Sequence, residues 1–157
     1  MIDPVIDPLI DIEIEDRAWG AAEPLVRLAA AAALGERRDS LVILLTDDTA
    51  VAALNAQFRD KAGPTNVLSF PAAANLENHL GDIALAYGVC VREAVDQGKA
   101  VNDHLQHLVI HGVLHLLGYD HQDAVSAARM ESLETSLLAG LGVADPYILT
   151  DERHDRA

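Results

Sequence analysis

The stretch between residues 102 and 121 constrains the fold of this chain more than any other, because it holds five of the seven histidines. We predict a helix over residues 102–117 that ends at Gly118, since glycine commonly terminates helices. Successive helical residues turn by about 100°, so His111 and His115 lie about 40° apart on one face, one turn from each other. Both imidazoles can therefore reach one metal ion, as in helical zinc motifs of the zincin type.

His121 follows the turn after this helix and is the candidate third ligand, reaching the ion from another direction. Three histidines with an open fourth position are typical of a catalytic zinc ion rather than of a closed structural site. Two histidines four residues apart are more often surface or capping residues, but the third histidine favours the metal. His104 and His107 lie on the same helical stripe, where they either support the site from outside or are polar residues above the core.

The residue after the first histidine of the pair narrows the reaction class. A zinc protease of the HExxH type has its general base, a glutamate, at that position. This chain has Gly112 there, so peptidase chemistry lacks its base. The chain also contains no GxSxG nucleophile elbow and no GxxxxGK[ST] phosphate loop. If the protein is an enzyme, we expect the metal itself to activate water or to polarise the bond that breaks.

A second candidate site residue is Arg59, which together with Lys61 supplies the only basic side chains between Arg38 and Arg92. Both lie at the end of a predicted helix, beside a Gly-Pro turn. A guanidinium group at that place can offer its planar fork to a phosphate or a carboxylate. The alternative is structural: Arg59 pairs with Asp60 or another acid, or packs its stem on the core.

Composition limits the partners. The 157 residues include 25 acidic and 11 basic side chains, for a net charge of −14, which argues against a DNA coat or a basic membrane-surface protein. More than half of that charge lies at the two ends, so a local cationic site remains possible. One cysteine, Cys90, fits a reducing compartment, and the longest apolar run, 28–34, is too short to span a bilayer. We therefore expect a cytoplasmic protein.

The hydrophobic pattern predicts an α+β fold, a small mixed sheet packed with helices, one of which carries the HxxxH motif. A chain of this length usually forms one domain, so we expect a single domain over 1–157 with peripheral ends at 1–8 and 140–157. Strands 67–70 and 83–87 are expected to pair as an antiparallel hairpin, with a loop over 72–80. The other predicted elements are strands 10–14 and 41–45, and helices 24–34, 47–58, 89–97, 102–117 and 123–138.

Three blocks of the sequence are similar to the YbeY family of rRNA maturation factors. The blocks are HGVLHLLGYDH (111–121), NAQFRDKAGPTNVLSFP (55–71) and LGDIAL (80–85). The family consists of small bacterial metal-binding proteins described as single-strand-specific endoribonucleases. The resemblance covers nearly the whole chain except the ends. It implies that His111, His115 and His121 bind Zn²⁺ and that Arg59 is the functionally important arginine. Asn66 departs from the family, in which many members have aspartate, and this weakens any role for a carboxylate base there.

We therefore expect a zinc-dependent endoribonuclease that acts on single-stranded rRNA of the small ribosomal subunit, at the 3′ end of 16S rRNA, and in ribosome quality control. Either water or the 2′-hydroxyl of the substrate would be the nucleophile, with Arg59 stabilising charge on the phosphate. The alternative is a non-enzymatic, zinc-stabilised assembly factor that docks on a ribosomal protein or a ribosome-associated GTPase, which the acidic surface favours. A hydrolase of another small substrate is a third possibility. Neither DNA nor a membrane is an expected partner.

Overall fold

Four strands form one mixed sheet in the computed structural model, which describes residues 9–73, 75, 78–120 and 122–147. The strands are β1 (Ile10–Ile14), β2 (Ser40–Thr46), β3 (Val67–Pro71) and β4 (His79–Ala86), in the order β1-β2-β4-β3. β1, β2 and β4 run parallel, and β3 pairs antiparallel with β4. The predicted interior strand at 41–45 and the predicted hairpin are both confirmed.

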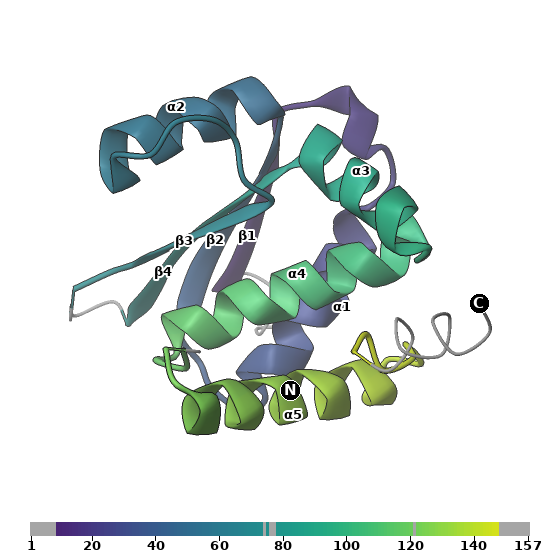
Figure 1. Ribbon diagram of the computed structural model, residues 1–157. Helices are drawn as coiled ribbons and strands as arrows, with labels where there is room; N and C mark the ends of the chain where they lie inside the picture. The colour runs from purple at the N-terminus through teal and green to yellow at the C-terminus, as the bar shows by residue number, and fades with distance from the viewer. Residues whose placement is uncertain (1–8, 74, 76–77, 121, 148–157) are drawn as a thin grey trace.

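The helices lie on both faces of this sheet (Figure 1). They are α1 (Glu23–Leu34), α2 (Asp48–Arg59), α3 (Tyr87–Gln97), α4 (Val101–Leu116) and α5 (Ala124–Gly140), with a short 3₁₀ helix, η2 (Arg17–Trp19), before α1. α2 covers one face, α1 and α4 cover the other, and α5 packs against α4 on the side away from the sheet (Figure 1). The α+β class predicted from the sequence is confirmed.

The two faces bury very different amounts of apolar surface. Alternate residues of a strand point to opposite faces, and Leu41, Ile43 and Leu45 of β2 all enter the large core with α1 and α4. The face under α2 has only a small cluster around Val51 and Ala84. A fully buried leucine or isoleucine contributes about 1.5–3 kcal/mol, so α4, buried between the sheet and α5, is a firmly held platform.

Gly112 allows α4 to approach the sheet closely. A Cβ atom at this position would lie 3.2 Å from Cδ1 of Ile83 and 3.3 Å from Oγ of Ser69. The residue after His111 therefore faces the sheet, and a glutamate there would require the side chains of Ile83 and Ser69 to give way. The fold thus disfavours an HExxH-type base at this position.

One predicted boundary is wrong. Residues 72–80 were expected to form a loop, but β4 begins at His79, because Ser40 and Leu41 of β2 pair with His79 and Gly81. A polar stretch is a local signal, and strand pairing outweighed it. The last helix, predicted to run to about residue 138 and to be ended by Gly140, does end at Gly140.

Some expectations concern residues that the structure does not describe. The ends 1–8 and 140–157 were predicted to be peripheral; residues 1–8 and 148–157 lie outside the described residues, as does His121. Residues 140–147 are described and are not peripheral, because Val143 is buried in the large core and the hydroxyl of Tyr147 donates to buried Glu134. The single-domain arrangement stays a prediction. Within the described part of the chain, no helix combines the length and the apolar character that crossing a membrane requires.

Candidate active site

The two histidines of the HxxxH motif lie side by side on the second half of α4. The ring centroids of His111 and His115 are 4.6 Å apart, and the rings are nearly perpendicular, at 80°. Both side chains are half-buried. The predicted placement of the pair on one face of the helix is therefore confirmed as geometry, since it follows from helical spacing alone.

A buried carboxylate on α5 orients His111. Glu134 is only 1% exposed, and its Oε2 lies 2.6 Å from Nδ1 of His111. Its Oε1 accepts hydrogen bonds from Nε2 of His107, at 2.9 Å, and from the hydroxyl of Tyr147. A buried carboxylate needs several donors to offset its lost hydration, and these three groups provide them.

The pKa of Glu134 reports this balance. Burial by itself would raise the pKa of the carboxyl, but the hydrogen bonds from His107, His111 and Tyr147 outweigh burial and lower the pKa to about 2. Glu134 is therefore ionised at neutral pH and accepts protons only in hydrogen bonds. Nδ1 of His111 must then be the donor, so in the neutral imidazole the lone pair lies on Nε2.

This arrangement fits a metal ion. A ligating histidine commonly donates its other ring N–H to a carboxylate, which fixes the tautomer and raises the basicity of the ligating nitrogen. His111 has that partner in Glu134, and His115 lies beside it. Among the residues that the structure describes, no three side chains of the ligand types converge. The predicted third ligand, His121, is outside that set.

Arg59 is the last residue of α2, and its side chain lies across β3. Its Nη2 donates a hydrogen bond to the carbonyl oxygen of Ser69, and its Cζ atom is 5.4 Å from the ring centroid of Phe70. A guanidinium above an aromatic face gains a cation–π interaction. The structural alternative for Arg59 was a pair with Asp60 or another acid, or packing of its stem on the core. Among the described residues no acid pairs with it, but its guanidinium lies over Phe70, which packs against the smaller core cluster, and it bonds a backbone carbonyl.

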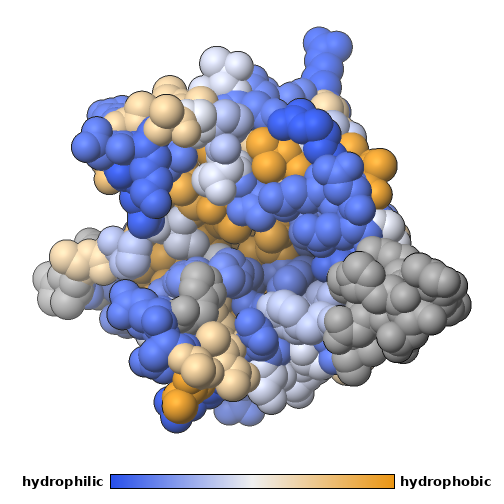
Figure 2. All heavy atoms as spheres, viewed as in Figure 1, coloured by the Kyte–Doolittle hydropathy of each residue, from blue (hydrophilic) through white to orange (hydrophobic). Residues whose placement is uncertain are grey.

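Arg59 and the two histidines line one pocket of about 360 Å³, here called the arginine pocket. Its wall also includes Asn66, Ser69 and Pro71. Ser69 joins the two sides, because its carbonyl holds Arg59 and its hydroxyl donates to the carbonyl oxygen of Gly112 on α4, at 3.1 Å. Figure 2 shows a hollow on this face between α2 and α4, with apolar atoms on its floor and hydrophilic side chains on the α4 side.

His104 and His107 do not join the pair at 111 and 115 but hold carboxylates. Nε2 of His104 is 2.9 Å from Oε1 of Glu93 on α3, and Glu93 also accepts from Nδ2 of Asn66, at 2.9 Å. His104 is buried, and this burial lowers the pKa of its imidazole despite the nearby Glu93. These contacts fit the first of the two predicted roles, because each histidine supports a neighbouring group.

Sequence reasoning missed Glu134, Tyr147 and Glu93. A signal existed for Glu134: it lies four residues after Met130 and four before Leu138, both buried, so an acid stands in the apolar stripe of a helix. An acid at such a position needs buried partners. Tyr147 and Glu93 carry no comparable pattern, because their partners lie on other elements.

Comparison with known proteins identifies the class. The sequence profile of the family described as Endoribonuclease YbeY matches residues 11–142, and the chain therefore belongs to the YbeY family. The family resemblance and the enzyme class expected from the sequence, an endoribonuclease, are confirmed.

Individual relatives agree with this assignment. An endoribonuclease YbeY of Maricaulis maris is 54% identical over 145 residues, which cover 88% of this chain and 91% of the relative. One of Chelativorans sp. is 48% identical and covers 87% of each chain. The solution structure of TM1509 from Thermotoga maritima matches with a TM-score of 0.61 and 27% identity, over 82% of this chain and 86% of that one. The likeness therefore extends to the fold.

Proposed function

We propose that this protein is a zinc-dependent endoribonuclease that cleaves single-stranded rRNA in the arginine pocket. The observation that carries this proposal is that Arg59, His111 and His115 line one pocket although they come from opposite sides of the sheet edge. A cation for the phosphate and a histidine pair for a metal are the two parts that metal-assisted phosphodiester cleavage needs.

The metal ligands in this proposal are His111, His115 and His121. Glu134 supports this assignment, because it fixes the Nδ1–H tautomer of His111 and so directs the Nε2 lone pair outward. A zinc ion bound there supplies a Lewis acid and lowers the pKa of bound water. Imidazole ligands also suit nickel and copper, so metal analysis decides the identity.

Arg59 acts on the substrate rather than on the metal. Its guanidinium group has five N–H donors. Among the described contacts only Nη2 forms a hydrogen bond, to the carbonyl oxygen of Ser69. The remaining donors can form a fork to a phosphate oxygen pair and stabilise the charge that develops during cleavage. The Phe70 ring keeps the group from folding back into solvent.

The proposed cellular substrate is the 3′ end of 16S rRNA, in maturation and in ribosome quality control in the cytoplasm. Membership of the family supports this assignment. The proposed protein partner is a basic ribosomal protein or a ribosome-associated GTPase. The exposed acids Asp11 and Glu13 on edge strand β1 support it, as does the neighbouring apolar pocket with Phe58, whose side chain is 59% exposed.

The test is a cleavage assay on matched RNAs. Purified zinc-loaded protein is incubated with a single-stranded 16S 3′-end fragment and with the same fragment in a duplex. We expect cleavage of the single strand only, and its loss after chelation and restoration by Zn²⁺. Full activity of the metal-free protein in chelator would disprove the metal-dependent function. Binding without any cleavage would favour the non-enzymatic assembly factor.

A further inference from the structure

A second and larger pocket adjoins the arginine pocket, and the proposed cleavage places no part of the substrate in it. It has a volume of about 500 Å³ and is here called the histidine pocket. The polar and ionisable side chains that line it are those of Asn66, Glu93, Gln97, Lys99, His104, His107, His111 and Tyr147. Asn66 and His111 line both pockets, so the two spaces are continuous along α4.

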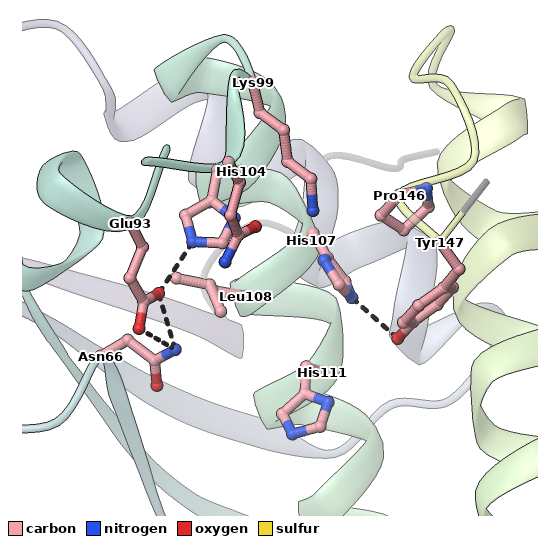
Figure 3. A pocket seen from close by; sticks show the side chains of 10 residues that line it. Asn66, Glu93, Lys99, His104, His107, Leu108, His111, Pro146 and Tyr147 are labelled. Atoms are coloured by element: carbon pink, nitrogen blue, oxygen red, sulfur yellow. Dashed lines mark hydrogen bonds and ion pairs between the residues drawn. The ribbon is translucent and has the colours of Figure 1, made fainter. Parts of the chain in front are cut away.

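The histidine pocket has two unlike walls (Figure 3). Glu93 and Asn66 lie on one side, and Pro146 and Tyr147 lie on the other, with His104, His107 and Leu108 between them (Figure 3). The rings of His107 and Tyr147 are 5.6 Å apart and nearly perpendicular, at 85°. One wall is therefore polar and the other aromatic, as an aromatic ligand with a polar edge requires.

The polar wall offers hydrogen-bond acceptors. Oε1 of Glu93 accepts hydrogen bonds from Asn66 and His104, whereas Oε2 accepts, from the described residues, only the longer bond from Asn66, at 3.2 Å, and a carboxylate oxygen can accept two. The Nδ1 atoms of His104 and His107 also lack a hydrogen-bond partner among the described residues, but both atoms are fully buried and out of a ligand's reach. The acceptor that the pocket presents is therefore Oε2 of Glu93, which favours a ligand with an N–H donor.

We propose that the histidine pocket binds the base of the nucleotide next to the cleaved phosphate, and that it prefers bases with an exocyclic amino group. This inference rests on the proposed function, in which the phosphate occupies the arginine pocket. Adenine, cytosine and guanine each carry an exocyclic amino group that can donate a hydrogen bond to the Glu93 carboxylate, whereas uracil has a carbonyl oxygen where cytosine has its amino group, and the carboxylate repels that oxygen.

A base fits this pocket better than a second phosphate does. Lys99 lines the pocket and would attract an anion, but the carboxylate of Glu93 also lines it and that of Glu134 lies behind His107, so two negative charges stand against one ammonium group. A base can enter only when it is unpaired and unstacked, because its hydrogen-bonding edge must be exposed. The pocket therefore gives a physical origin for single-strand specificity: a duplex can present its phosphate but not its base.

The experiment measures base preference in binding. Zinc-loaded protein is titrated with 2′-O-methyl trinucleotides that differ only in one base, cytosine, adenine or uracil, and affinity is followed by fluorescence anisotropy. We expect cytosine and adenine to bind about tenfold tighter than uracil, the discrimination typical of a well-placed base contact. Equal affinities for all three bases in the wild-type protein would overturn the inference.

Two variants and a matched control locate the preference. Glu93→Gln keeps the size and one acceptor oxygen but replaces the other with a donor, so the preference should fall to within about twofold. Gln97→Ala should weaken binding about threefold to tenfold without touching the Glu93–His104 contact. Asp96→Asn removes the same charge from the exposed side of α3 and should change nothing. A base preference unchanged in Glu93→Gln would refute the assignment, and thermal melts verify folding.

A parallel cleavage assay separates this inference from the function it rests on. If the wild-type protein cleaves single-stranded RNA but binds all bases alike, only the base pocket is wrong. If it cleaves no RNA yet shows a base preference that Glu93→Gln removes, the pocket stands and the cleavage function fails.

Discussion

The two halves of the candidate active site are held in opposite ways. The histidine half, His111 and His115 with Glu134, stands on a helix buried between the sheet and α5. The arginine half, Arg59 with Ser69 and Phe70, lies at the exposed end of α2, over the face with the smaller core. A metal ion needs ligands fixed before it binds, whereas an arginine that meets a long substrate can tolerate some freedom. The histidine half, which needs the more precise geometry, is therefore the buried half.

The largest effect is expected on the histidine half. His115→Ala should abolish metal binding and reduce cleavage at least about a thousandfold, because a metal supplies several kcal/mol of transition-state stabilisation. Metal content by mass spectrometry and the rate on single-stranded RNA check this. His79→Ala removes a histidine from β4, outside both pockets, and should retain the metal and most of the activity. A zinc-replete, active His115→Ala protein would show that the pair is not a ligand site.

The next largest effect is expected on the arginine half and distinguishes it from the histidine half. Arg59→Ala should keep the metal and the folded state but lower the cleavage rate about 100–1000-fold, as removal of one charge-stabilising donor does elsewhere. Arg59→Lys should restore only part of the rate, since an ammonium lacks the planar fork. Arg92→Ala, which breaks an exposed pair with Asp48, serves as the control. An unchanged rate in Arg59→Ala would assign the residue a structural role.

A smaller effect is expected from the buried carboxylate. Glu134→Gln should weaken zinc affinity about 10–100-fold, the usual cost of losing an outer-shell partner. Competition with a chromophoric chelator measures this affinity. Glu131→Gln, on the exposed side of the same helix, should leave it unchanged. If both variants bound zinc like the wild type, Glu134 would serve stability alone.

The smallest effect is expected at the link between the halves. Ser69→Ala removes the hydroxyl that bonds the Gly112 carbonyl but keeps the backbone carbonyl that holds Arg59. The free energy of unfolding should fall by about 1 kcal/mol and the cleavage rate by less than tenfold. Urea unfolding and initial rates measure both. Ser136→Ala, exposed on α5, should be neutral. A large rate loss with unchanged stability would mean that Ser69 contacts the substrate directly.

The sequence predicted the local parts of this molecule well. Every α-helix and strand was anticipated within about four residues, because caps, glycine stops and alternation act over one or two turns of chain. The 3₁₀ helix η2 was not anticipated. The strand order, with β4 inserted between β2 and β3, could not be derived in the same way. Pairing between Ser40 and His79 depends on how distant segments pack, and no local pattern encodes it.

The sequence by itself determined that His111 and His115 share one face, because 3.6 residues per turn is a property of any helix. Only the tertiary structure decided that Glu134, 23 residues away, fixes the tautomer of His111, and that Arg59 reaches the same pocket across β3. Those contacts arise when α5 and α2 pack onto the rest of the fold, and packing is a collective outcome of the whole core. The histidine spacing follows from local helix geometry, whereas the contacts around the pair follow from the packing of the core.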